Sequence, residues 1–184
     1  MRRTRPIPSD RRANRGKLWE AECEASLEQY HRAGSVQCWF RCHPEIKITR
    51  SHKGGKVEGF IRSKGPPDVV AVLTGGPVLL ADFKSSQADR FPLAAISEHQ
   101  AQRFTEWEGP GRTAAVLLRL QGRRYVLPWS AVAPAYKARQ EARAAGLRAA
   151  SGTASLSLAD LEALGLACSS GGWLAPLMSW WGAL

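Results

Sequence analysis

The chain has 184 residues, 44% of them hydrophobic, which is enough apolar material for the core of one domain and argues against intrinsic disorder. Lysine and arginine total 26 against 16 aspartates and glutamates, and the formal net charge of +10 points to a polyanionic partner, most commonly nucleic acid. No segment reaches the ~18 apolar residues of a membrane span and no signal-peptide pattern is present, so we expect a soluble cytoplasmic protein with no membrane partner.

The N-terminal segment is strongly basic. Residues 1–17 carry seven lysines and arginines against one acid, Asp10, with two prolines and no apolar period. We therefore expect residues 1–13 to form a flexible basic arm, followed by a single domain over residues 14–184.

A helix and an edge strand are predicted next. Residues 16–34 place apolar side chains at helical intervals and end on Gly34, a residue suited to a helix C-cap. Residues 35–49 alternate polar and apolar side chains in two short runs divided by Pro44. Such alternation interrupted by proline is typical of a strand at the edge of a sheet.

The segment that follows is basic and has a reversal signal. Residues 50–67 contain five lysines and arginines, and the pair Gly54-Gly55 is suited to a tight turn. We predict an exposed basic hairpin or loop here, with residues 49–66 forming a basic stalk.

The middle of the chain predicts two antiparallel strand pairs with a helix between them. A Gly-Gly-Pro turn separates the members of the first pair, and a Gln-Gly turn separates those of the second. Between the pairs, a helix is predicted because five residues fall on one side at helical spacing: Ile96, His99, Gln100, Arg103 and Trp107. The strands are expected at 68–74, 77–84, 114–120 and 123–129, and the helix at 94–109.

C-terminal helices and a tryptophan-rich tail are expected over residues 135–184. The pattern from Ala135 is helical and basic, and a Ser-Gly-rich break then follows. A short helix is predicted at 157–165 with Ser157 as its N-cap. The apolar end, residues 171–184, is too short to cross a membrane and is predicted to be a packed tail or a subunit contact.

The four cysteines give no clear metal or redox motif. None forms a C-x-x-C pair, so reduced thiols are expected. Cys38, Cys42 and His43 have a loose metal-like spacing, but no second ligand pair completes a tetrahedral zinc site.

Two charged residues end the second predicted strand. Asp82 and Lys84 are two residues apart, so on a strand they project from the same face. Asp68 begins the neighbouring strand, and a hairpin of this length can bring its carboxylate close to that of Asp82. Two carboxylates beside a lysine form a hard-oxygen site that suits Mg²⁺, and this grouping suits hydrolysis of a phosphodiester.

The spacing alone leaves two interpretations open. A surface ion pair between Asp82 and Lys84 at a fraying strand end fits the pattern equally well. Glu45 and Lys47 have the same acid-x-Lys spacing, but no Pro-Asp pair precedes them as Asp68 precedes Asp82.

The order of these motifs resembles the PD-(D/E)xK nuclease superfamily, because Pro67-Asp68 is followed by Asp82-Phe83-Lys84. More narrowly, the chain is similar to the RecU-type Holliday-junction resolvases from about residue 14 to residue 133. The additional motifs that carry this likeness are Asn14-Arg15-Gly16 with Glu20, FPLAAISEHQ with His99-Gln100, and YVLPWSAV. The chain departs from the family in having Asp82 where Glu is usual and in a shorter segment before Asp68.

The resemblance implies a fold and a chemistry. The fold class would be α/β, a restriction-endonuclease-like core with a central mixed β-sheet flanked by helices and a protruding basic β-hairpin. The cofactor would be Mg²⁺, for which Mn²⁺ is expected to substitute. The implied metal ligands are Asp68, Asp82, the backbone carbonyl of Phe83, and Glu20, while Lys84 would position the attacking water and Gln100 would line the site.

Two of these residues keep a structural alternative. Glu20 also fits a first-turn carboxylate favoured by the helix dipole, and Gln100 fits an ordinary helix-surface residue. His99 is expected to be a packed or hydrogen-bonded histidine and is left out of the chemistry.

DNA contacts follow from the charge. Three basic clusters, at residues 2–17, 50–64 and 137–148, can contact phosphates with little base preference. The resemblance implies that the stalk enters the branch point. Phe60 in this stalk would either stack on an unpaired nucleobase or serve as a small hydrophobic anchor where the loop leaves the domain. The predicted DNA-binding residues are Arg15, Lys17, Arg50, Lys53, Lys56, Arg62, Lys64, Lys137 and Arg139.

The function predicted from these features is that of an Mg²⁺-dependent, structure-selective endonuclease. It would resolve four-way DNA junctions by symmetric nicking in recombination and repair, as a nucleoid-associated protein of cellular or phage origin. Because a four-way junction has two-fold symmetry, a C₂ homodimer is expected. A nuclease for other branched or duplex DNA and a non-catalytic DNA-binding module are the alternatives.

Overall fold

A mixed five-stranded sheet forms the centre of the protein. The computed structural model describes residues 8–61, 65–147, 154–163, 167–168 and 172–182. The sheet has the spatial order β1-β4-β5-β7-β8, in which β5 and β7 are parallel and the other neighbours are antiparallel. Its strands are β1 (Val36–Arg41), β4 (Val69–Leu73), β5 (Val78–Ser86), β7 (Arg112–Leu120) and β8 (Arg123–Pro128).

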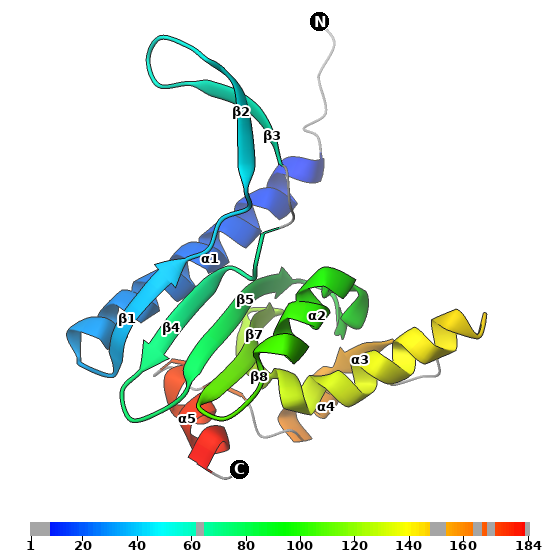
Figure 1. The fold of residues 1–184 in the computed structure, drawn as a ribbon. Helices are drawn as coiled ribbons and strands as arrows, with labels where there is room; N and C mark the ends of the chain where they lie inside the picture. Colours follow the sequence, from blue (N-terminus) through cyan, green and yellow to red (C-terminus); the bar gives the residue numbers. More distant parts are fainter. Residues whose placement is uncertain (1–7, 62–64, 148–153, 164–166, 169–171, 183–184) are drawn as a thin grey trace, which may run out of the picture.

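Helices cover the sheet. Figure 1 shows α1 (Pro8–Arg32) behind the sheet and α2 (Glu98–Trp107) and α3 (Trp129–Ala144) in front of it. Because β5 and β7 are parallel, the chain between them must cross over the sheet, and α2 makes this crossover. The α/β fold class, with a central mixed sheet flanked by helices, is therefore confirmed.

Short elements complete the chain. A single turn of 3₁₀-helix, η1, precedes α2, and β6 pairs with β9 in a small sheet. None of the helices in the described ranges is both long and apolar enough to span a membrane. The bounds are β6 Arg90–Pro92, η1 Leu93–Ala95, β9 Ser155–Ser157, α4 Leu158–Ala163 and α5 Leu174–Gly182.

The core lies along β7, which is buried on both faces. Every residue from Thr113 to Leu118 is buried, as expected for a strand that has covering elements on each side. Leu117 is fully buried, and its carbonyl oxygen accepts a hydrogen bond from the indole N–H of Trp19 at 2.9 Å. This bond fixes α1 to the centre of the sheet.

Truncation of Leu117 should be costly. We expect Leu117→Ala to lower the free energy of unfolding by about 2–5 kcal/mol, because it removes buried contacts and leaves a cavity. Urea unfolding followed by circular dichroism measures the change. The control is Leu147→Ala, which alters a side chain that is 66% exposed and should change stability by less than about 0.5 kcal/mol. Equal losses in the two variants would contradict this account of the core.

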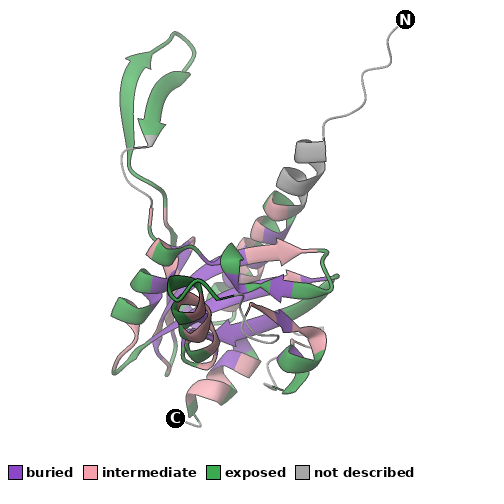
Figure 2. Cartoon of the chain, turned by 90° about the vertical axis from the view of Figure 1, so that its right-hand side faces the viewer, coloured by how far each residue is buried: buried purple, intermediate pink, exposed green. Residues whose placement is uncertain are grey.

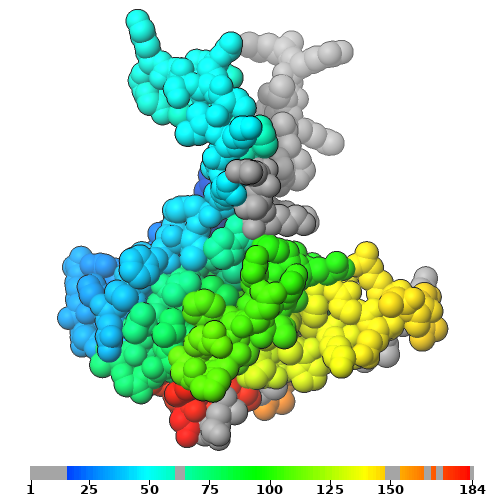
Figure 3. All heavy atoms as spheres, viewed as in Figure 1, coloured from blue at the N-terminus to red at the C-terminus, as the bar shows by residue number. Residues whose placement is uncertain are grey.

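A hairpin of two strands stands off the body. β2 (Ile46–Ser51) pairs with β3 (Val57–Ile61), and the described side chains of both strands are exposed. Figures 1, 2 and 3 all show the hairpin projecting from the end of the domain where β1 ends and β4 begins. The predicted reversal is confirmed, since Gly54 and Gly55 have φ of 88° and 79° in the left-handed region that glycine favours.

Several predicted boundaries were wrong. α1 begins at Pro8, so residues 8–13 belong to a helix rather than to a flexible arm; proline suits the first helical turn and no strong breaker follows it before Gly16. The edge strand is β1 alone, since residues 46–51, predicted to continue it, form half of the hairpin. Residues 1–7 and the basic Arg148 lie outside the described residues.

The helices on the front face also begin elsewhere than predicted. α2 begins at Glu98 because Ser97 caps it: the Ser97 hydroxyl accepts from the Gln100 N–H, and the Gln100 side chain accepts from the Ser97 N–H. α3 begins at Trp129, before Pro134, because the Trp129 ring is buried against Phe104 and Tyr136 at centroid distances of 5.4 and 5.5 Å.

The short C-terminal helix and the packing of the apolar end are confirmed, whereas the strand β9 was not predicted. The Ser157 hydroxyl accepts a hydrogen bond from the Asp160 N–H at 3.1 Å, which confirms it as the cap of α4. Trp173, Leu174 and Leu177 are buried against the core, so the tryptophan-rich end is a packed tail.

Candidate active site

The register of β4 and β5 places two carboxylates face to face. Val69 pairs with Ala81 and Val70 with Leu80, so the same register continued beyond the start of β4 puts Asp68 opposite Asp82. Cross-strand partners project from the same face of a sheet, and Lys84 projects there too, two residues after Asp82. The geometry therefore gathers the three residues of the sequence motif where β4 begins. The prediction that Asp82 and Lys84 end their strand was wrong, because β5 continues to Ser86 through its pairing with β7.

Asp82 is the most buried charged group of this cluster. Its side chain is 2% exposed, Oδ1 accepts a hydrogen bond from Gln100 Nε2 at 2.5 Å, and Oδ2 forms an ion pair with Lys84 Nζ. Burial raises the pKa of Asp82 to about 6, although the Lys84 ammonium opposes this shift. The carboxylates of Asp68 and Glu20 reinforce it, because each disfavours a further negative charge.

Asp68 and Lys84 lie nearer to solvent. Asp68 is half-buried, and its Oδ2 accepts a hydrogen bond from the Phe83 N–H at 2.7 Å, which ties the start of β4 to β5. The Lys84 side chain is 21% exposed, so its ammonium can face Asp82 and still reach water. The arrangement leaves a cation, two carboxylates and an amide around one point.

Glu20 is not gathered into this group. On α1 its carboxylate pairs with the Arg41 guanidinium at 3.1 Å, and Arg41 also pairs with Glu24 at 2.8 Å. In the parts of the chain that the structure describes, no three His, Cys, Asp or Glu side chains are close enough to hold a metal ion together. The predicted three-carboxylate set is thus not assembled, since Arg41 satisfies Glu20.

The carboxylate oxygens of Asp68 and Asp82 still suit a hard divalent cation as ligands. Mg²⁺ is usually bound by one or two carboxylates, with waters and substrate phosphates completing its octahedron. Asp82 Oδ2 is buried and has no hydrogen-bond donor among the described residues, only the ion pair with Lys84. A buried carboxylate oxygen of this kind beside Asp68 fits Mg²⁺ or Mn²⁺. The Phe83 carbonyl as a further ligand stays a prediction.

The predicted DNA-binding residues are spread over three elements. Lys17 on α1 and Arg50, Lys53 and Lys56 on the hairpin are exposed, as is Lys137 on α3, which lies 3.9 Å from Glu141, while Arg139 is half-buried. The side chain of Arg15 and the residues Arg62 and Lys64 lie outside the described residues. Phe60 lies near the base of the hairpin opposite Lys47, is 53% exposed, and has Lys47 Nζ 5.9 Å from its ring centre.

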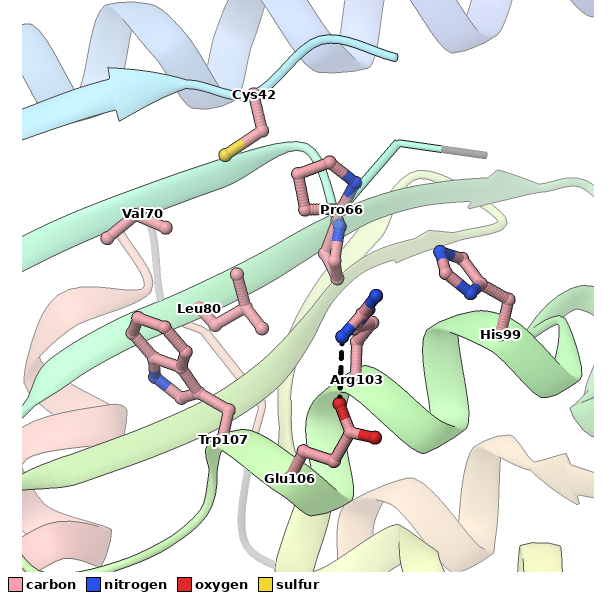
Figure 4. A pocket seen from close by; sticks show the side chains of 9 residues that line it. Cys42, Pro66, Val70, Leu80, His99, Arg103, Glu106 and Trp107 are labelled. Carbon is pink, nitrogen blue, oxygen red and sulfur yellow. Dashed lines mark hydrogen bonds and ion pairs between the residues drawn. The ribbon is translucent and has the colours of Figure 1, made fainter. Parts of the chain in front are cut away.

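A pocket beside the carboxylates contains residues that the sequence analysis left out of the chemistry. His99, Arg103 and Trp107 project from α2 into a pocket of about 630 Å³, facing Val70 and Leu80 on the sheet (Figure 4). These three residues recur every four positions, which places them on one helix face. That spacing is visible in the sequence, but it does not show whether this face of the helix lines a pocket or packs against the core.

Comparisons with known proteins give a distant structural likeness. No family model matches the chain, and no curated protein matches it. Among solved structures, the chain is similar to Hjc, a Holliday junction resolvase from the archaeal hyperthermophile Archaeoglobus fulgidus, with 17% sequence identity and a TM-score of 0.39. The match covers 63% of this chain and 74% of that one. The candidate site therefore rests on the strand register and the contacts described above.

Proposed function

We propose that this protein is an Mg²⁺-dependent, structure-selective endonuclease that nicks four-way DNA junctions. The observation that carries the proposal is the cluster at the start of β4 and the middle of β5, where Asp68 and Asp82 face each other beside Lys84 and Gln100. The net charge of +10 and the exposed basic hairpin support a nucleic-acid substrate.

The proposed mechanism is hydrolysis of one phosphodiester bond by water. A bound Mg²⁺ would neutralise the phosphate oxygens and make its water more acidic. Asp68 and Asp82 would hold the ion, and Gln100 fixes the Asp82 carboxylate by donating to Oδ1. The Lys84 ammonium would orient the attacking water and stabilise the negative charge that develops on the phosphate.

The hairpin and symmetry suggest how a junction is chosen. The hairpin projects from the end of the domain where β4 begins (Figure 1), and the Cys42 N–H beside it donates to the Asp68 carbonyl at 2.8 Å, so DNA at the site would meet its basic residues. We further propose a C₂ homodimer, because two sites related by a two-fold axis would cut opposite strands of a two-fold symmetric junction.

The test is incubation with Mg²⁺ and three end-labelled DNAs: a four-way junction, a fork and a linear duplex. We expect paired nicks in the junction, at a rate roughly tenfold or more above that for the duplex, a difference of about 1.4 kcal/mol in activation free energy. EDTA should stop the reaction and Mn²⁺ should restore it. Cleavage of the fork alone would indicate a nuclease for another branched DNA, and binding without cleavage in Mg²⁺ or Mn²⁺ would indicate a non-catalytic module.

A further inference from the structure

The pocket beside the carboxylates continues the same face of the sheet. Val70 and Leu80 form the cross-strand pair two residues inward from Asp68 and Asp82, and both line the pocket. Because side chains two residues apart on a strand share a face, the pocket floor and the carboxylates form one surface. A DNA strand whose phosphate lies at Asp82 would therefore pass the pocket mouth.

The pocket wall combines an apolar slot with polar groups. Trp107 faces Leu80, and its indole N–H donates to the Val78 carbonyl at 3.1 Å, which holds the ring in place. Arg103 extends across the pocket toward Pro66 and pairs with Glu106 at 2.9 Å (Figure 4). The Arg103 side chain is 51% exposed, so part of its guanidinium faces the opening.

His99 leaves a polar atom in the pocket wall without a partner. Its Nε2 is buried and makes no hydrogen bond to any described residue. An unpaired buried polar group is unfavourable, and one in a binding pocket can be satisfied by a ligand. His99 directly precedes Gln100, which contacts Asp82, so this nitrogen belongs to the turn of α2 next to the proposed metal site.

We propose that this pocket takes one unstacked nucleobase of the strand that is cut, next to the scissile phosphate. The inference rests on the proposed function. A base has apolar faces and a polar edge, which match an aromatic and aliphatic slot ending at an unpaired nitrogen. The volume, about 630 Å³, lies within the usual range of small-ligand pockets.

The charge and the substrate favour a base over an uncharged small molecule. Arg103 at the opening would contact the phosphate of the inserted nucleotide, as guanidinium groups commonly do. Nucleotides at a branch point have lost part of their stacking and pairing, so taking one out costs less there than within a duplex. Occupation of the pocket would thus add to the preference for branched DNA.

The test measures junction binding in EDTA, so it does not depend on cleavage. A set of four-way junctions carries a single abasic site, moved one nucleotide at a time past the mapped or expected cut position. We expect wild-type protein to bind roughly tenfold more weakly when the abasic site falls at one position beside the cut, and normally at the others.

Two variants link this effect to the pocket. His99→Ala should weaken binding of the intact junction and show little further loss with the abasic junction, because both changes remove the same contact. Arg103→Ala should weaken binding of both junctions by the same factor. Arg32→Ala is the control, since Arg32 makes a similar exposed helix ion pair with Glu28, and it should behave as wild type.

The outcomes separate the two proposals. If wild-type protein binds and nicks the intact junction but tolerates every abasic position equally, the pocket inference is wrong and the nuclease proposal stands. If it neither binds nor nicks any branched DNA, the proposed function fails and the inference falls with it. If His99→Ala does not fold, the position-specific abasic loss in wild type decides the inference, and its absence overturns it.

Discussion

Asp82→Asn should abolish Mg²⁺-dependent cleavage and leave junction binding nearly unchanged. Asparagine keeps the shape of the side chain and can still accept from Gln100, but it lacks the negative charge that a divalent cation requires. Loss of a group that only supports a metal ligand typically costs 10- to 100-fold, so loss of a ligand should reduce the nicking rate by about 100-fold or more. Single-turnover nicking and electrophoretic mobility shifts of the same junction measure the two effects.

The substitution should not act by unfolding the protein. Burial disfavours the charged form of Asp82, as its raised pKa shows, so a neutral amide is compatible with this position in the absence of metal. We expect the metal-free Tm of Asp82→Asn to equal or exceed that of wild type. Mg²⁺ should raise the Tm of wild type by linkage and should raise that of the variant much less.

The control for Asp82→Asn is Asp89→Asn. Asp89 is exposed, lies a few residues further along the chain, and accepts from Gln121 Nε2 at 2.6 Å. This variant should nick junctions at the wild-type rate. Wild-type cleavage by Asp82→Asn would remove the proposed active site, whatever the behaviour of the control.

The first strand pair and the facing of its two aspartates could be predicted from the sequence because local signals agree there, whereas the continuation of β5 to Ser86 depends on its pairing with β7. Two apolar runs of matching length flank a Gly-Gly-Pro turn, and the antiparallel register then brings Asp68 opposite Asp82. The hairpin reversal was predictable for the same reason, since adjacent glycines supply the positive φ that it needs.

The differences arise where distant contacts decide the structure. Trp129 was assigned to a strand because it ends an apolar run, but its packing against Phe104 starts a helix there. The ion pair between Glu20 and Arg41 joins residues 21 positions apart on a helix and a strand, and no local pattern encodes it. The pocket likewise forms only when α2 packs on β7 and so faces Val70 of β4 and Leu80 of β5.

Removal of the hairpin should erase the preference for junctions while the body stays folded. β2 and β3 contact each other extensively, and their described side chains are exposed. A methyl group added at Gly65 would lie only 2.7 Å from the Pro44 nitrogen. Gly65 and Pro44, one on each side of the hairpin in the sequence, are therefore close together in space. Replacing residues 46–61 by Gly-Gly therefore closes the gap without stretching the chain. We expect Tm to change by less than about 4 °C, which corresponds to a change of about 1 kcal/mol in the free energy of unfolding.

Shape and charge of the hairpin can be separated by a second variant. Changing Lys47, Arg50, Lys53 and Lys56 to Gln keeps the strands and removes phosphate contacts, so affinity for junction and duplex should fall together and the salt dependence of both should flatten. The deletion should instead lower junction affinity more than duplex affinity, because a projecting hairpin can enter only an open branch point. Phe60→Ala should reproduce part of that selective loss, roughly 5-fold or more, if the exposed ring stacks on a base. If the deletion variant keeps the wild-type ratio of junction affinity to duplex affinity, selectivity resides in the rest of the domain and not in the hairpin. The charge variant would then differ from wild type only in its overall affinity for DNA.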